Sequence, residues 1–309
     1  DADRPGEVVV AKLGSPLAIG IGKDEYFIAS DASPFIEYTK RTIYLDDNEM
    51  AVISREQGFK MYSIINDKVI TPIIQDIQLS LETIEKGGFD YFMLKEIHEQ
   101  PHAITDTFRG RLLVDQRRIN ISGIEHNKEI FKNASRITII ACGTSWHAGL
   151  VAEYLFEDAA RIPVEVEYAS EFRYRNPVIN KGDIVIAISQ SGETADTLAA
   201  IKLAKENGAF VFGICNVVGS SIARAADGGA YTHAGPEIGV ASTKAFTTQL
   251  TVIIMMGLRL GQLKGTIDNA DFDRVAKQLA ALPKLIESVL AYDKQIEKIA
   301  REYKDASNF

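Results

Sequence analysis

The chain has 309 residues, of which 46% are hydrophobic and 25% are charged, and its formal net charge is −8. This balance is typical of globular proteins, and the length suggests about two domains, each able to bury its own core. The negative charge argues against a nucleic-acid partner, so an anionic ligand would have to be held by local geometry. No apolar run approaches the roughly 20 residues of a membrane helix, and no signal peptide opens the sequence. We therefore expect a cytoplasmic protein without a membrane partner.

Two cysteines, Cys142 and Cys215, both lie in apolar runs with the character of strands. We expect both thiols to be buried. Two buried thiols in a chain of this length indicate a reducing compartment rather than a disulfide framework, which agrees with a cytoplasmic location.

Residues 1–90 are predicted to be rich in β-strands. Short runs of Val, Ile, Tyr and Phe alternate with turn residues such as Asp46-Asp47-Asn48, a spacing typical of antiparallel strands joined by hairpins. The runs fall at 7–13, 16–22, 25–30, 41–47, 50–56 and 59–64. Because a strand begins almost at residue 7, this segment looks like the later part of a larger domain.

Residues 91–134 carry charges of both signs and three of the five histidines, His98, His102 and His126. A histidine cluster could bind a metal ion. However, Pro101 separates the first two histidines and argues against a continuous helix that presents both on one face. We therefore interpret this region as a hinge or connector and predict no metal site.

From residue 135 the pattern changes to alternating strands and helices, which is typical of an α/β fold with a parallel sheet covered on both faces. Five strands are predicted, at 136–143, 163–170, 183–189, 210–216 and 229–235. Six helices are predicted, at 144–161, 193–208, 220–227, 242–263, 270–291 and 293–303. If the strand order is the flavodoxin-like 2-1-3-4-5, the switch point lies between the first and third strands, where ligands bind beyond the carboxyl ends.

Two loops flank this switch point, "ACGTSWHAG" at 141–149 and "SQSGETADT" at 189–197. Each ends a strand and begins a helix, whose unpaired N–H groups and dipole favour an anion. Gly143 and Gly192 allow the backbone to approach a bulky anion. Each hydroxyl alone is explained by helix capping. The second loop, however, carries more hydroxyls than one cap requires: Ser189, Ser191, Thr194 and Thr197.

Neither loop has the Gly-Lys-Ser/Thr of a P-loop or the G-x-G-x-x-G of a dinucleotide site, which argues against a nucleotide ligand. A third stretch, "EIGVASTKAFTTQ" at 237–249, also reads as a strand end leading into a helix. Within it Lys244 could contact an anion, although a lysine in the first helical turns is more often solvated. His147, just inside the first helix, could be catalytic, but local packing or bonding is the favoured interpretation.

In order and spacing, "CGTSWHAG", "ISQSGETADT" and "EIGVASTKAFTTQ" resemble the first sugar-isomerase (SIS) domain of the glutamine–fructose-6-phosphate amidotransferase family. The upstream "GSPLAIGIG", "FIASD" and "YFMLKEIHEQP" resemble the end of that family's glutaminase domain, an Ntn-type α+β fold, and its hinge. The resemblance implies three parts: the end of a glutaminase domain at 1–90, a hinge at 91–134, and a first SIS domain at 135–309.

The resemblance also implies a transferase of amino sugar biosynthesis, which converts fructose 6-phosphate and glutamine to glucosamine 6-phosphate and glutamate without a cofactor. It implies that a sugar phosphate is the ligand and that SIS domains pair into a homodimer. Ser189, Gln190, Ser191 and Thr194 would then hold the phosphate and neighbouring hydroxyls. The remaining residues would line or close the sugar pocket: Cys142, Gly143, Thr144, Ser145, Val240 and Ser242.

The sequence departs from the family pattern in two ways. The family's glutaminase uses an N-terminal cysteine, whereas this sequence begins Asp1-Ala2-Asp3, and the family's catalytic glutamate, histidine and lysine belong to a second SIS domain. We therefore expect an interior piece that binds the sugar phosphate without turnover and has no catalytic residue of its own. One alternative is a non-catalytic SIS module that senses a sugar phosphate, which predicts a DNA-binding or partner segment in place of residues 1–90. Another is an independent isomerase, whose only loop carboxylates would be Glu193 and Asp196.

Overall fold

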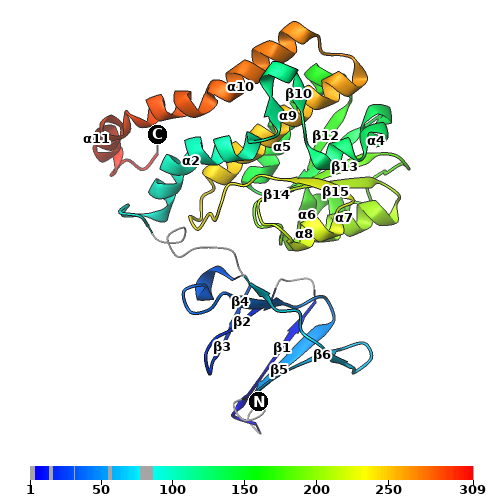
Figure 1. The fold of residues 1–309 in the computed structure, drawn as a ribbon, viewed down its shortest axis with the longest axis vertical. Helices are drawn as coiled ribbons and strands as arrows, with labels where there is room; N and C mark the ends of the chain where they lie inside the picture. Colours follow the sequence, from blue (N-terminus) through cyan, green and yellow to red (C-terminus); the bar gives the residue numbers. More distant parts are fainter. Residues whose placement is uncertain (1–3, 14–16, 31, 55–57, 77–85, 309) are drawn as a thin grey trace. The chain divides into compact units, whose positions relative to one another are not determined.

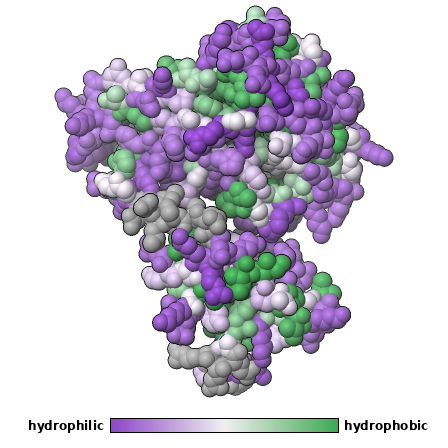
Figure 2. Space-filling model, viewed as in Figure 1, coloured by the Kyte–Doolittle hydropathy of each residue, from purple (hydrophilic) through white to green (hydrophobic). Residues whose placement is uncertain are grey.

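A computed structural model describes residues 4–13, 17–30, 32–54, 58–76 and 86–308. The chain divides into two compact units, which we call the N-terminal unit (Asp1–Gly87) and the C-terminal unit (Gly88–Phe309). Within the described residues, no helix has the length and apolar character needed to cross a membrane. Hydrophilic residues predominate on the face of the C-terminal unit drawn in Figure 2.

The N-terminal unit consists of two antiparallel sheets, with strand orders β1-β5-β6-β7 and β3-β2-β4-β8. The strands are β1 (Glu7–Lys12), β2 (Ala18–Ile21), β3 (Tyr26–Ala29), β4 (Arg41–Tyr44), β5 (Glu49–Ser54), β6 (Gly58–Ser63), β7 (Val69–Ile70) and β8 (Gln75–Asp76), with one 3-10 turn, η1 (Ser33–Phe35). Buried side chains of β2 and β4 pack against those of β5 and β6 in one cluster. All six predicted strands are present, while residues 16, 55 and 56 of the predicted runs lie outside the described residues. β7 and β8, two residues each, were not predicted.

The C-terminal unit begins with helix α2 (Phe92–Phe108), which contains Pro101 and both neighbouring histidines. The expectation that this proline breaks the helix is therefore wrong. Pro101 has no N–H to donate to the carbonyl of Ile97 four residues earlier, but the side-chain amide of Gln100 donates to that carbonyl at 2.9 Å. A side chain thus replaces the missing helical hydrogen bond, and the helix continues for two more turns.

A short connector follows α2, made of the hairpin β9 (Leu112–Leu113) and β10 (Arg118–Ile119), the turn η2 (Val114–Gln116), and the helices α3 (Ser122–Glu125) and α4 (Lys128–Asn133). It packs into the main core of the unit through Ile119, Ile124 and Phe131, which are fully buried.

The main sheet of the C-terminal unit is parallel and has the order β12-β11-β13-β14-β15, which is the predicted 2-1-3-4-5 order. Its strands are β11 (Ile137–Ala141), β12 (Val164–Tyr168), β13 (Ile184–Ser189), β14 (Phe210–Cys215) and β15 (Gly228–Tyr231). The helices are α5 (Thr144–Ala160), α6 (Ala169–Tyr174), α7 (Ala195–Glu206), α8 (Ser221–Ala225), α9 (Lys244–Lys264), α10 (Asn269–Leu290) and α11 (Asp293–Tyr303). The predicted α/β fold is thus confirmed, and α6 is a helix that the sequence pattern did not predict.

Both faces of this sheet are buried, as the continuous apolar runs require. Alternate residues of β13 belong to different clusters: Ile184, Ile186 and Ile188 pack with α5 and α9, whereas Val185 and Ala187 pack with α6, α7 and α8. Helices therefore cover both faces (Figure 1), and only the ends of the strands can open to a ligand.

Candidate functional site at the carboxyl edge of the sheet

The structure brings the first two predicted loops to one edge of the sheet. β11 and β13 are adjacent and parallel, and Ala141 pairs with Ile188 at the end of the ladder. Strand β11 ends at Ala141 and β13 one residue later, at Ser189, so the chain leaves the two strands at nearly the same level. The loops that follow begin helices α5 and α7, so two helix N-termini, one from each face of the sheet, lie at this edge.

The first loop ends in an uncapped helix. Gly143 is the N-cap of α5, with φ 58° and ψ −135°, and no side chain caps the helix. This left-handed backbone is readily adopted by glycine. Thr144 is exposed at the first helical position, whereas Ser145 is buried. The first backbone N–H groups of α5 are thus available, and they carry the positive end of the helix dipole.

The second loop is held by its own hydroxyls. The Oγ of Ser189, which is only 4% exposed, accepts the N–H of Gly192 at 3.0 Å and lies 3.1 Å from the Oγ1 of Thr194. Ser191 accepts the N–H of Glu193 at 3.2 Å and is half-buried, as is Gln190. Thr194 is the N-cap of α7, but its side chain does not cap the helix. Ser189 therefore fixes the loop conformation from its buried position at the end of β13, while Ser191 and Thr194 are partly exposed to solvent.

Both the backbone conformation and the available space require a glycine at position 192. Its φ is 68°, and a Cβ at this position would lie 2.0 Å from the Oγ of Ser220 and 2.5 Å from the Cβ of the same residue. Thr197, the fourth hydroxyl of the stretch, is fully buried. It therefore lies in the core and not at the rim of the site.

The third segment differs from its prediction. β15 ends at Tyr231 and α9 begins at Lys244, so an extended loop of residues 232–243, rather than a strand end, leads into the helix. The carboxylate of Glu237 caps α9, because its Oε1 accepts the N–H of Thr243 at 2.9 Å and that of Ala245 at 3.0 Å. Ser242 donates its hydroxyl to the other oxygen of Glu237 at 2.9 Å. Val240 is fully exposed.

A buried hydrogen bond links the third segment to the first loop. The Nε2 of Gln249, in the second turn of α9, donates to the Oγ of Ser145 at 3.0 Å, and both residues are buried. Helix α9 packs along α5 in the same core cluster. The structure thus ties Ser145 to the helix that follows Val240 and Ser242, while no direct hydrogen bond joins Val240 or Ser242 to the other two loops among the described residues.

Lys244 and Arg173, which lie on helices that border the site, are both paired with carboxylates. Lys244 is 3% exposed, and its Nζ lies 2.6 Å from the Oε2 of Glu99, so the expectation that it is solvated is wrong. Arg173, on α6, pairs with Asp196 of the first turn of α7 at 2.8 Å. The loops themselves contain no lysine, arginine or histidine apart from His147.

His147 is exposed, and its ring meets the edge of Trp146 with centroids 5.0 Å apart. Trp146 in turn stacks on Tyr168 at 4.4 Å. This arrangement agrees with the local packing that the sequence favoured over a catalytic role.

The two thiols differ, and neither forms a disulfide. Cys215 is buried at the end of β14, and burial raises the pKa of its thiol to about 12, so it is protonated at neutral pH and a poor nucleophile. Cys142 is only half-buried. The expectation that both thiols are buried is wrong for Cys142, because it follows the last residue of β11 and stands at the open edge of the sheet.

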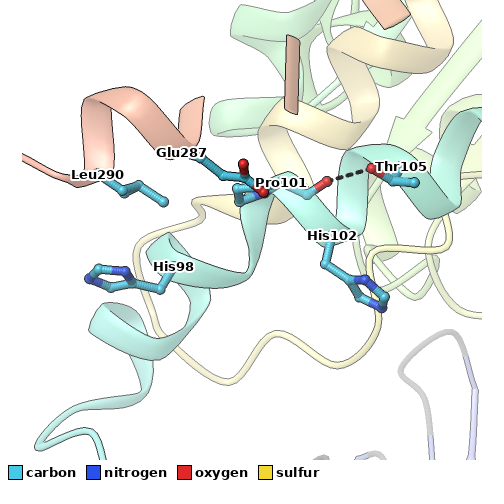
Figure 3. Close-up of a pocket in the computed structure, with 6 residues that line it drawn as sticks. All are labelled: His98, Pro101, His102, Thr105, Glu287 and Leu290. Carbon is cyan, nitrogen blue, oxygen red and sulfur yellow. Dashed lines mark hydrogen bonds between the residues drawn. The ribbon is translucent and has the colours of Figure 1, made fainter. Parts of the chain in front are cut away.

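A groove of about 520 Å³ lies elsewhere, between α2 and α10, where it is lined by His98, Pro101, His102, Thr105, Glu287 and Leu290 (Figure 3). The two imidazoles do not converge: the Nε2 of His98 lies 3.9 Å from Asp293, and that of His102 lies 3.2 Å from Asp106. No group of three or more metal-binding side chains occurs in the described part of the chain. Because the groove is not at the carboxyl edge of the sheet, it is not the predicted site.

Three residues that shape the site escaped the sequence analysis as functional positions: Glu96, Glu237 and Gln249. Glu237 and Gln249 are the first and last residues of the third stretch quoted above, but Glu237 lies too far before α9 for a capping-box pattern. Glu96 is on α2, and its contact with the third segment spans 142 residues of sequence. Local patterns do not reveal such a contact.

The parallel sheet and its hydroxyl-rich strand ends define a SIS domain, and a family model described as the SIS domain matches residues 130–259. A glutamine–fructose-6-phosphate aminotransferase from Bacteroides thetaiotaomicron is 51% identical over all 309 residues, which cover 50% of that relative. One from Chlorobaculum tepidum is 53% identical over 99% of this chain and 49% of its own. The C-terminal domain of glucosamine-fructose-6-phosphate aminotransferase from Francisella tularensis is 40% identical, with a TM-score of 0.67 over 72% of this chain and 62% of that chain.

The chain belongs to the glutamine–fructose-6-phosphate aminotransferase family, and it spans about half the length of the curated relatives it matches. The match extends over the N-terminal unit as well as the SIS domain. The alternative of a sensing module required an unrelated segment in residues 1–90 and is therefore wrong.

Proposed function

We propose that this chain binds fructose 6-phosphate at the carboxyl edge of the SIS sheet, as part of a transferase that forms glucosamine 6-phosphate and glutamate from fructose 6-phosphate and glutamine. The observation that carries the proposal is the pair of adjacent strand-end loops, each opening an uncapped helix N-terminus. The names of the relatives supply the reaction and its substrates.

The phosphate would be held without a basic side chain. Ser191 and Thr194 would donate hydroxyls, and the first N–H groups of α7 and α5 would add backbone donors and a favourable dipole. Gln190 and Ser189 would complete this end, with Ser189 acting mainly through the loop that it shapes. Since Lys244 and Arg173 are already paired with carboxylates, helix ends are the main source of positive field.

The sugar would extend from the phosphate toward the first loop, where Cys142, Gly143, Thr144 and Ser145 would line it. Gln249 donates to the Oγ of Ser145, which leaves the hydroxyl proton of Ser145 to point toward a ligand oxygen. Val240 and Ser242 would close the pocket from the third segment. We assign no metal or organic cofactor to this binding step.

Binding, and not turnover, is the expected property of a polypeptide of these 309 residues. Ketose–aldose isomerisation needs a group that can accept and return a proton near the reacting carbons. The carboxylates around the loops have other tasks: Glu193 accepts the N–H of Ser221 at 2.8 Å, Asp196 pairs with Arg173, and Glu237 caps α9. The independent-isomerase alternative therefore has no free general base among Glu193, Asp196 and Glu237.

The remaining parts of the proposal concern organisation. The N-terminal unit would be part of a glutaminase domain, residues 91–134 a hinge, and residues 135–309 the first SIS domain. The protein would act as a homodimer through its SIS domains, in the cytoplasm, where the two free thiols would remain reduced.

Calorimetric titration tests the proposal with three ligands: fructose 6-phosphate, glucosamine 6-phosphate and fructose. We expect saturable binding of both sugar phosphates and none of fructose, because the phosphate supplies most of the contacts. Equal binding of fructose, or no binding of any of the three, would contradict the proposed site. Glutamine-dependent formation of glucosamine 6-phosphate by this polypeptide would contradict its expected lack of turnover.

A further inference from the structure

Helix α2 holds the third segment of the site through a buried carboxylate. The side chain of Glu96 is 2% exposed. Its Oε1 accepts the N–H of Ile238 at 2.6 Å and that of Gly239 at 3.0 Å, and its Oε2 lies 3.3 Å from the same Gly239 nitrogen. No ion pair of Glu96 occurs among the described residues, so backbone amides alone satisfy this carboxylate.

A buried carboxylate is costly unless its oxygens are hydrogen-bonded. Here the two amides that satisfy it belong to the residues directly before Val240. The loop of residues 232–243 has no strand or helix of its own to fix it. Glu96 therefore sets the position of this stretch from outside the loop, by a contact that includes a charge-assisted hydrogen bond.

The approach of α2 to the loop is close. A Cβ at residue 239 would lie 2.6 Å from the Oε2 of Glu96 and 3.4 Å from the Cα of Met93. Gly239 is thus the residue that allows the loop backbone to reach the carboxylate. One turn further along α2, Glu99 pairs with Lys244 at 2.6 Å and lies 3.5 Å from Lys95, so the same helix also fixes the start of α9.

We propose that Glu96 is a positioning residue of the sugar-phosphate site, which places Val240 and Ser242 against the sugar while the phosphate end is held independently by the two strand-end loops. This inference rests on the proposed function, because it assumes that a sugar phosphate occupies the edge of the sheet. It adds a residue from the hinge region that acts through the loop backbone and does not touch the ligand.

The division between the two ends of the ligand gives the test. In Glu96→Ala the affinity for fructose 6-phosphate should fall about tenfold, the usual scale for the loss of a buried charged hydrogen bond that orients a contact. The affinity for inorganic phosphate should remain within about twofold, because the strand-end loops are unchanged. In Glu96→Gln the amide oxygen can still accept both N–H groups, so this variant should restore most of the affinity for fructose 6-phosphate.

The matched control is Glu206→Ala, which removes an exposed carboxylate from the far end of α7 and should change neither affinity. Gly239→Ala disturbs the same contact from the loop side and should weaken fructose 6-phosphate binding by a similar factor. Combined with Glu96→Ala, the glycine substitution should add little, because the clashing oxygen is gone. NMR titration of each variant measures both ligands, and circular dichroism checks that each is folded.

Each outcome decides the inference. Unchanged fructose 6-phosphate affinity in folded Glu96→Ala would overturn it while leaving the proposed function intact. Equal losses for fructose 6-phosphate and inorganic phosphate would also overturn it, because they would mean a general loss of structure. If Glu96→Ala does not fold, Gly239→Ala, which disturbs the same contact from the loop side, is judged by the same two criteria. Wild-type protein that binds neither ligand would overturn the proposed function and this inference with it. Wild-type protein that binds fructose 6-phosphate but not inorganic phosphate would contradict the claim that the strand-end loops hold the phosphate independently of the third segment.

Discussion

The two strand-end loops and the third segment, which we propose form one site, are positioned by different physical means. The loops at 142–145 and 189–194 emerge directly from neighbouring strands, whose ladder fixes where they begin. The segment 232–243 instead follows the edge strand β15. Its first residues are held by Asn216, directly after β14, and its later residues by two carboxylates, Glu96 and Glu237. The loops are therefore positioned by the sheet, and the later part of the segment by side chains that come from α2 and from the segment itself.

This difference teaches that a single site can have one part that is rigid by topology and another that depends on a few replaceable contacts. Substitutions in the strand-end loops should act mainly through backbone conformation and direct loss of donors. Substitutions around the third segment should act at a distance from the ligand.

The largest effect is expected for Gly192→Ala, in the second strand-end loop. The new Cβ would clash with Ser220, and alanine would have to adopt the positive φ of Gly192. The free energy of unfolding should therefore fall by about 3 kcal/mol, and fructose 6-phosphate binding should be lost. Gly143→Ala is the matched control, because its φ is also positive but its Cβ would meet open space; it should cost about 1 to 2 kcal/mol. Urea unfolding measures both, and equal costs would contradict the assigned clash.

In the third segment, Glu237→Ala should lower the free energy of unfolding by about 2 kcal/mol, because the buried helix α9 loses the acceptor for two N–H groups. Asp268→Ala removes the N-cap of the more exposed helix α10, where one N–H at 2.8 Å is affected, and should cost about 1 kcal/mol. Thermal unfolding compares the two. A larger effect for Asp268 would argue that Glu237 does not hold the segment.

The link between the two regions is broken by Gln249→Leu, which removes the donor to Ser145. We expect a loss of about 1.5 kcal/mol in stability and a several-fold weaker affinity for fructose 6-phosphate. Gln262→Leu, on the same helix, removes an exposed bond to the carbonyl of Arg117 and should leave ligand affinity unchanged. Calorimetric titration distinguishes them, and equal affinities would mean that the two regions are not coupled through this contact.

The smallest effect concerns Cys215, which lies beneath the second loop. Burial raises the pKa of its thiol from about 9 to about 12, so the folded state retains a proton that the unfolded state loses above pH 9. The contribution of this thiol to the free energy of unfolding is therefore complete below pH 9, and it is lost as the pH rises toward 12. Between pH 8 and pH 10 the wild type should lose ~1.4 kcal/mol more than Cys215→Ala. Urea unfolding at the two pH values checks this, and parallel losses would contradict the pKa assignment.

The sequence predicted the parts of this molecule that depend on local patterns. The positions of the strands and of the two strand-end loops followed from continuous apolar runs, which are characteristic of buried parallel strands. The strand order was taken from the common flavodoxin-like arrangement. Helix α6 was missed because six residues directly after a strand show too little periodicity to be recognised. Helix α2 was predicted to break because the compensating bond from Gln100 to Ile97 depends on a rotamer and not on residue type.

The third segment was predicted least well, for a physical reason. Glu96 and Ile238 are 142 residues apart, and the burial of Lys244 depends on Glu99, which lies 145 residues away in the sequence. Hydrophobic periodicity describes which face of an element is buried, but it does not describe which distant charge will meet a loop.

The central claim is that the two strand-end loops, each at a helix N-terminus and without a lysine or arginine, together hold a sugar phosphate. Titration of fructose 6-phosphate against wild type, Ser191→Ala, Thr144→Ala and the double variant tests this most directly. We predict that each single substitution weakens binding by about threefold to tenfold. The double variant should weaken it further, because Thr144 belongs to the first loop and Ser191 to the second, and each loop makes its own contact with the ligand. Wild-type affinity in both single variants, or an equal loss in the double variant and in Ser191→Ala alone, would contradict the claim that both loops bind the ligand.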